Sequence, residues 1–148
     1  MKPQRTLVLL ADETAARFLV ADGPGKGLRE LAGLSVSQFP DLQLAYQDRA
    51  PRNARPASSA RHAIDPRESL ETQLRERFAK HVAEALNQEW TEAGADRLVV
   101  AAGPKMLGIL RKLVSGAPAA ALAGDLPKDL MNTALNDLPK HLDGLIRF

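Results

Sequence analysis

A long amphipathic helix with a clear start is the feature that most restricts the fold of this chain. Asp65-Pro66-Arg67-Glu68 combines an N-cap residue, a proline at the first helical position and a glutamate three residues after the cap. Gly94 supplies a helix end. The spacing predicts a helix of roughly 40 Å that lays one apolar face on a sheet. The apolar positions recur every fourth residue: Leu70, Leu74, Phe78, Val82, Leu86 and Trp90.

Apolar runs of strand length flank this helix in the sequence. Thr6 to Ala11 and Ala16 to Ala21 are joined by a short polar turn, which indicates a hairpin. Arg97 to Ala102 is a third run of this kind. All three are almost continuously apolar, as in strands that are covered on both faces. Weaker strands are expected at Leu28 to Phe39, with a bulge at Gly33, and at Ala119 to Ala123.

Two more helices complete the pattern. Gly103-Pro104 opens one that continues to Gly116, and Leu135 to Ile146 has apolar residues at helical spacing. Strands and helices therefore alternate after an initial group of strands. This order predicts a three-layer α/β domain with a mixed sheet, antiparallel at the start and parallel later.

Composition restricts the classes of function. The 148 residues, 45% hydrophobic and 26% charged, predict one globular domain over residues 1–148. The absence of cysteine excludes thiolate zinc sites and cysteine nucleophiles. No apolar run reaches the roughly 20 residues of a membrane helix, and the short amino-terminal run is unlike a signal peptide. We expect a cytoplasmic protein without membrane insertion and without a cofactor; the oligomeric state is left open.

A polar loop from about residue 41 to residue 64 precedes the long helix. It lacks apolar periodicity, so we expect it to be exposed. Guanidinium groups bind phosphate oxygens in pairs, which makes the loop a candidate RNA-binding or anion-binding element. Arginine-rich loops are also common as simply solvated surface. The candidate binding residues in and beside the loop are Arg49, Arg52, Arg55, Arg61, His62 and Arg67.

Two further segments that contain glycine were considered as anion-binding sites. Lys105 follows Gly103-Pro104 at a helix start after a predicted strand, so it is a further candidate anion contact, or an exposed first-turn lysine. Gly23 to Gly27 lacks the Gly-Lys-Ser/Thr ending and the following helix of a phosphate loop. We interpret it as a turn.

The sequence supports a catalytic site or a metal site less well than it supports anion binding by the loop. Carboxylates at strand ends could gather around a metal pair, although turns and caps also favour aspartate. Ser58, Ser59, His62 and Asp65 include the residue types of a triad, but they lie in one short span, and Asp65 is already expected as a helix cap. We therefore assign no catalytic and no metal-ligating residue. The strand-end carboxylates are Asp12, Glu13, Asp22, Asp96 and Asp125.

Several short motifs, in order along nearly the whole chain, resemble the bacterial host attachment protein family. That family is similar to the middle domain of archaeo-eukaryotic peptide-release factors, which has a ribonuclease H-like fold. The motifs are Leu7 to Asp12 with Ala16-Arg17-Phe18, Arg61 to Pro66, Glu76 to Ala79, Pro104 to Gly108 with Leu110-Arg111, and Lys128-Asp129-Leu130.

The resemblance implies a position for the basic loop. In release factors, a loop before the long helix carries the Gly-Gly-Gln tip that enters the peptidyl-transferase centre. This sequence contains no Gly-Gly-Gln, so the resemblance implies a ribosome-facing or RNA-facing surface without that hydrolytic chemistry.

Three hypotheses for function follow. The first is a non-enzymatic module that binds RNA or the ribosome through the loop arginines. The second is a protein-interaction factor that acts indirectly in bacterial attachment to host cells. The third is a divergent hydrolase that uses His62 and strand-end carboxylates.

Overall fold

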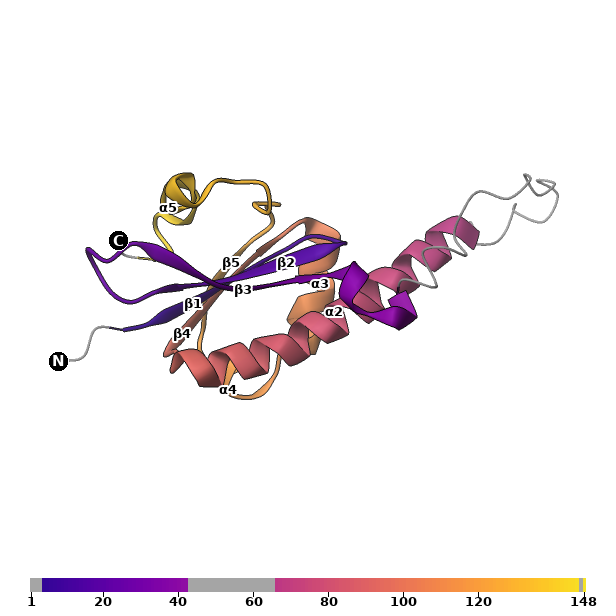
Figure 1. Ribbon diagram of the computed structural model, residues 1–148, viewed down its shortest axis with the longest axis horizontal. Coiled ribbons are helices and arrows are strands. Elements are labelled where there is room, and N and C mark those ends of the chain that lie inside the picture. The colour runs from indigo at the N-terminus through magenta and orange to yellow at the C-terminus, as the bar shows by residue number, and fades with distance from the viewer. Residues whose placement is uncertain (1–3, 43–65, 147) are drawn as a thin grey trace.

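The computed structural model describes residues 4–42, 66–146 and 148, and its centre is a five-stranded mixed sheet. The strands stand in the order β3-β2-β1-β4-β5 (Figure 1). β1 pairs antiparallel with β2 and parallel with β4, and β5 runs parallel to β4. The predicted change from antiparallel to parallel pairing is confirmed. The strand bounds are β1 Thr6–Ala11, β2 Ala15–Ala21, β3 Leu28–Ser35, β4 Arg97–Ala102 and β5 Leu122–Leu126.

β1 is the central strand because its sequence allows burial on both faces. All six of its residues are buried. Its register pairs Thr6 with Ala21 in β2 and with Arg97 in β4, so two long-range ladders share one strand. The continuous apolar runs of the sequence are thus explained by a sheet with layers on both sides.

The third strand is shorter than the sequence pattern predicts. β3 ends at Ser35, and residues Val36–Gln38 form a 3-10 helix, η1. The Ser35 side chain accepts a hydrogen bond from Ser37 N–H, while Gln38 accepts one from Ser35 N–H. This capping box ends the strand. The bulge is at Leu31, between partners Ala32 and Glu30, rather than at the predicted Gly33.

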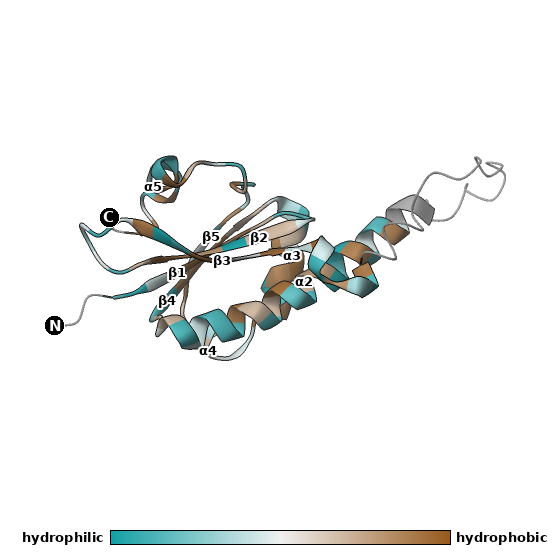
Figure 2. Ribbon diagram, viewed as in Figure 1, coloured by the Kyte–Doolittle hydropathy of each residue, from teal (hydrophilic) through white to brown (hydrophobic). Residues whose placement is uncertain are grey.

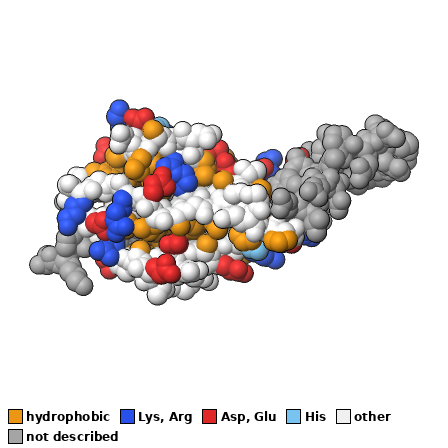
Figure 3. All heavy atoms as spheres, in the orientation of Figure 1, with side chains coloured by type: hydrophobic (Ala, Val, Ile, Leu, Met, Phe, Trp, Pro, Cys, Tyr) orange, Lys and Arg blue, Asp and Glu red, His pale blue; other side chains and the backbone are white. Residues whose placement is uncertain are grey.

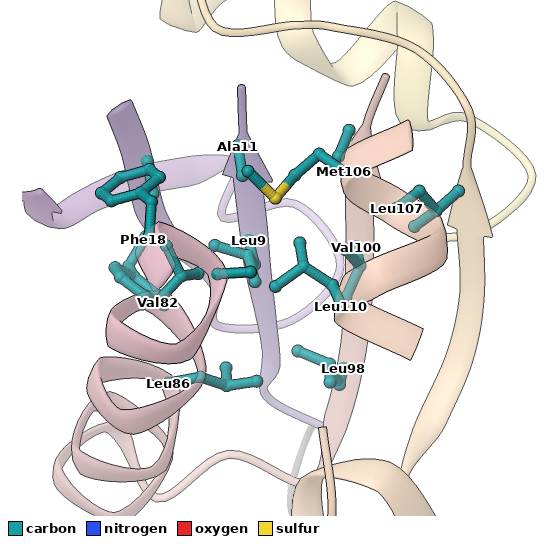
Figure 4. Packing of buried hydrophobic residues seen from close by; sticks show 14 of the residues in the cluster. Leu9, Ala11, Phe18, Val82, Leu86, Leu98, Val100, Met106, Leu107 and Leu110 are labelled. Atoms are coloured by element: carbon teal, nitrogen blue, oxygen red, sulfur yellow. The ribbon is translucent and has the colours of Figure 1, made fainter. Parts of the chain in front are cut away.

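One face of the sheet is covered by two helices. α2 spans Pro66–Ala93 and α3 spans Pro104–Leu113. Their apolar sides meet β1, β2 and β4, with Val82 and Leu86 of α2 and Met106 and Leu110 of α3 pointing at the strands (Figures 2 and 4). α2 ends where predicted, because Gly94 has a φ of 62°, which favours glycine. Its first turns extend past the sheet (Figure 1).

The opposite face carries a smaller cluster under short elements. η3, Leu135–Asp137, and α5, Leu138–Leu142, replace the predicted continuous helix from Leu135 to Ile146. Pro139 has no N–H and is tolerated only in a first helical turn, so a new helix starts beside it. Gly144 follows with a φ of 93°. None of the helices in the described part of the chain has the length and apolarity to cross a membrane.

The last strand is displaced from its predicted position. Residues Gly116–Ala120 form a short helix, α4, and the strand follows at Leu122–Leu126 instead of Ala119 to Ala123. Short alanine-rich runs do not separate helix from strand by periodicity. Pairing with β4 fixes the position of this strand, which includes Gly124 and Asp125, beyond the predicted end at Ala123.

Candidate functional site

The predicted binding residues fall into two groups in the structure. Arg49, Arg52, Arg55, Arg61 and His62 lie outside the described residues. The backbone of Arg67 belongs to the first turn of α2, but its side chain is also outside the described part. Lys105 is described and is exposed at the start of α3.

A cavity of about 530 Å³ lies where β1 and β4 end. Because these two strands are parallel neighbours, Ala11 and Ala102 end at the same edge of the sheet. The chain then continues as the β1–β2 turn from one strand and as α3 from the other, so both segments border the cavity. Lys105 is one of its lining residues, as are two of the predicted strand-end carboxylates. The lining comprises Asp12, Glu13, Thr14, Gly103, Pro104, Lys105, Met106 and Asp129.

Asp12 holds the turn beside this cavity. Its Oδ1 accepts hydrogen bonds from the backbone N–H groups of Thr14, at 2.8 Å, and Ala15, at 2.7 Å. The Thr14 hydroxyl donates to the same oxygen. One carboxylate oxygen therefore organises the hairpin turn, which is the local role that aspartate takes in such turns.

Glu13 forms an ion pair with a buried arginine that the sequence analysis missed. Oε1 of Glu13 lies 2.7 Å from Nε and 2.6 Å from Nη2 of Arg75. The Arg75 side chain is 9% exposed, whereas that of Glu13 is 51% exposed. Arg75 lies on the same face of the helix as the buried residues Ala79 and Val82. An arginine at a position of the apolar face is the sequence signal that could have indicated a buried ion pair.

The remaining strand-end carboxylates also have structural partners. Asp22 binds Arg29 at 2.8 Å and Arg5 at 2.9 Å, and the hydrogen bond from Arg29 lowers the pKa of Asp22. Asp96 accepts the Arg5 backbone N–H. Within residues 4–42, 66–146 and 148 no three His, Asp or Glu side chains are grouped so as to hold a metal ion.

The histidines and the triad-like residues do not form a site in the described part of the chain. Ser58, Ser59, His62 and Asp65 all lie outside it. His81 stacks on Phe39 with ring centroids 3.9 Å apart, and its Nε2 lies 3.5 Å from Asp41 Oδ1. His81 therefore ties the segment after β3 to α2.

Arginines of the described fold are used mainly for structure. Seven arginine side chains are described, and six of them bind carboxylates or backbone carbonyls. Arg17, for example, binds Glu30 and the carbonyls of Met131 and Thr133. On the face shown in Figure 3, acidic side chains lie beside the basic ones. The six are Arg5, Arg17, Arg29, Arg75, Arg97 and Arg111.

Charge is therefore unevenly divided along the chain. Residues 49–64 include four arginines and no acidic residue, a formal charge of +4. The whole chain has a formal charge of +2, so the other residues together carry −2. Asp48 and Asp65 flank this arginine-containing stretch directly, so the whole of residues 43–65, which lies outside the described residues, has a formal charge of +2.

The comparisons with known proteins identify the family. A family model described as "Protein required for attachment to host cells" matches residues 7–142. The chain belongs to this family. Its predicted membership is thus confirmed. Among curated proteins, no sequence matches the chain.

Solved structures show what the fold of this family member resembles. An archaeal translation termination factor superposes with a TM-score of 0.50 and 16% sequence identity, over 82% of this chain and 29% of that one. ParM from Bacillus thuringiensis, determined with ATP, gives a TM-score of 0.49 and 11% identity, over 97% of this chain and 48% of that one. The predicted fold class, an α/β domain with a mixed sheet and a fold like that of a release factor, is confirmed.

Proposed function

We propose that this host attachment family member is a non-enzymatic module that binds RNA, with the ribosome as its cytoplasmic partner. The arginines of residues 49–64, with Arg67, would contact phosphate oxygens. The observation that carries the proposal is the division of charge. Described arginines are mostly engaged by carboxylates and carbonyls of the fold, whereas the four in residues 49–64 are accompanied in sequence only by Asp48 and Asp65 at the two ends of their segment.

The elements that flank this segment support the proposal. Leu42, the last described residue before it, is fully buried in the core. Pro66, the first one after it, starts a 28-residue helix that is packed against the sheet through Leu74, Phe78 and Val82. Leu42 and the packed part of α2, from Leu74 onwards, therefore belong to the same hydrophobic core. The likeness to a translation termination factor favours a ribosomal partner over other polyanions.

Co-sedimentation with ribosomes through sucrose, over a range of salt concentrations, tests the proposal. Replacing Arg49, Arg52 and Arg55 with glutamine removes three phosphate contacts. Binding should be lost at physiological salt, and the slope of log K against log salt should fall by about 2 if the contacts are to single-stranded RNA.

A matched control distinguishes the loss of specific arginine contacts from the effect of a lower net charge on ribosome binding. Lys26, Lys112 and Lys140 are exposed on the described fold, and their replacement with glutamine removes the same total charge. The control variant should sediment with ribosomes as the unchanged protein does. Equal loss in both variants, or full retention in the arginine variant, contradicts the proposal.

The family description favours one alternative function, a protein-interaction factor in attachment. A protein partner would be retained after ribonuclease treatment and at high salt, whereas an RNA partner would not. Ribonuclease-resistant, salt-insensitive binding that is unaffected by the triple arginine substitution would replace the first proposal with this one.

A further inference from the structure

Arg77 differs from the six other described arginines, which carboxylates or carbonyls of the fold engage. It makes no hydrogen bond or ion pair within residues 4–42, 66–146 and 148. It is exposed on α2, two positions after the buried Arg75. A guanidinium group carries five N–H donors and is always charged, so the donors of Arg77 are available to a ligand.

Helix geometry places Arg77 on a polar stripe that faces away from the sheet. At about 3.6 residues per turn, Gln73, Arg77 and Lys80 lie opposite the buried side chains of Phe78 and Val82. All three polar side chains are exposed. We call these three residues the α2 stripe. They belong to the half of α2 whose first turns extend past the sheet (Figure 1), so a long ligand can reach them.

The sign of the charge on this outward face changes along the helix. The α2 stripe carries two cations and no carboxylate, and the next charged residue on the same face is Glu84. Glu76 is exposed beside the stripe but forms no ion pair with Arg77 or Lys80. The cationic half of α2 is also the half that follows the basic residues 49–64 in the chain.

Helix stability gives no reason for this arrangement. Side chains three positions apart are neighbours on a helix surface, so the charges of Arg77 and Lys80 repel each other. A helix favours cations in its last turn, where carbonyl groups lack partners, yet the last turn of α2 has no basic residue. A bound anion would relieve the repulsion between Arg77 and Lys80.

We propose that the α2 stripe binds the phosphate backbone of RNA. The inference rests on the proposed function, because the RNA bound by residues 49–64 continues along the helix that follows them. Arg77 donates to one phosphate in a bidentate manner, and Lys80 and the amide of Gln73 donate to its neighbours. Glu84 repels phosphate and limits the contact to the first half of α2.

Co-sedimentation with ribosomes over a range of salt concentrations tests the α2 stripe. Arg77→Gln combined with Lys80→Gln removes two phosphate contacts. Affinity should fall about tenfold, and the slope of log K against log salt should fall by about 1.4 if the contacts are to single-stranded RNA. Lys112→Gln with Lys140→Gln removes the same charge elsewhere on the fold and should change neither quantity. Unchanged affinity and slope in the α2 double variant overturn the inference.

The same measurement separates this inference from the proposed role of the basic segment. If replacing Arg49, Arg52 and Arg55 abolishes binding while the α2 double variant binds normally, the proposed function stands and the inference fails. If the α2 double variant loses binding while the triple variant retains it, the α2 stripe stands and the role of the basic segment fails. Binding of the unchanged chain that resists both salt and ribonuclease contradicts both.

Photo-cross-linking provides a second test that leaves the two cations in place. The chain contains no cysteine, so a benzophenone maleimide marks a single introduced thiol. Gln73→Cys labelled in this way should cross-link to ribosomal RNA. Thr91→Cys is the control, because Thr91 is exposed on the same face of α2 about five turns later. Equal cross-linking of RNA from both positions, or cross-links from Gln73→Cys to protein alone, overturn the inference.

Discussion

At the scale of single residues, the pair of Glu13 and Arg75 shows how burial and charge interact. The guanidinium is nearly buried, and the carboxylate is half exposed. A buried charge that loses its partner is strongly destabilising, whereas an exposed one is rehydrated. The two members of this ion pair should therefore respond differently to substitution.

Glu13→Gln should destabilise the fold more than Arg75→Met, although Glu13 is the more exposed residue. The first change leaves a buried guanidinium without a counter-charge, at a cost of about 1–3 kcal/mol. The second keeps an apolar stem in place and frees a carboxylate that water can reach, so about 1 kcal/mol or less is expected. Urea unfolding of both variants measures the difference. A larger loss of unfolding free energy for Arg75→Met than for Glu13→Gln would mean that Arg75 stabilises the fold chiefly through packing.

Glu89 gives a pH-dependent prediction. Burial, and then the charge of Glu92, raises the pKa of Glu89 in the folded state. A carboxyl group with a raised folded pKa favours the protonated form, so its ionisation costs stability as pH rises through the unfolded value. Glu89→Gln should therefore raise the free energy of unfolding slightly at pH 7, and should have little effect at a pH below the unfolded-state pKa of the carboxyl group.

Glu84→Gln is the control for this effect, since Glu84 is exposed on the same helix. Urea unfolding at pH 7 and at pH 3.5 or so measures both variants. A gain for Glu89→Gln that is as large in acid as at neutral pH would show that its cause is not ionisation.

At the scale of elements, helices and strands with strong local sequence signals were predicted correctly, and those with weak signals were not. α2 has a start motif, a repeated apolar spacing and a terminal glycine, and its observed span is Pro66–Ala93. β1 and β4 have the predicted bounds as well. α4 was not predicted and β5 was predicted three residues too early, because a run of alanines has no periodicity that separates helix from strand. Pairing with β4 determines where the strand lies.

Phe78 is the side chain through which α2 contributes most to the core. It is fully buried and meets the edge of Phe39 with ring centroids 6.4 Å apart. Phe78→Ala should cost about 3–5 kcal/mol of unfolding free energy. Lys80→Ala, at an exposed position of the same helix, should change it by less than about 0.5 kcal/mol. A cost below about 1 kcal/mol for Phe78→Ala would mean that α2 is only loosely packed on the sheet.

At the scale of the whole molecule, the two faces of the sheet are covered unequally. α2 and α3 bury the larger cluster, which includes Phe18 and Phe78. The other face relies on η3, the five-residue α5 and the C-terminal residues, with Leu138, Leu142 and Ile146 buried. Short elements with few apolar contacts open at a lower free energy than the rest of a domain.

Native-state hydrogen exchange should therefore separate the two layers. Amides of β1 and β4 should exchange only by global unfolding, whereas those of α5 should exchange through local opening at a free energy several kcal/mol lower. Exchange measured against low concentrations of urea distinguishes the two routes. Equal protection and equal urea dependence for α5 and β1 would show that both layers open as one unit.

The candidate site was predictable in part. Asp12, Glu13 and Lys105 stand at strand ends in the sequence, and the structure brings them to one cavity because β1 and β4 are parallel neighbours. Arg75, which pairs with Glu13 across 62 positions, was missed. Binding by the arginines of residues 49–64 remains a prediction.

The sequence by itself determined the long helix, the central strands, the α/β class and the uneven division of charge. These properties depend on local spacing and composition, which can be counted along the chain. Tertiary structure alone decided which carboxylate meets which arginine and where β5 lies. Contacts such as that of Arg5 with Asp96 join residues 91 positions apart, and only the path of the folded chain brings them together.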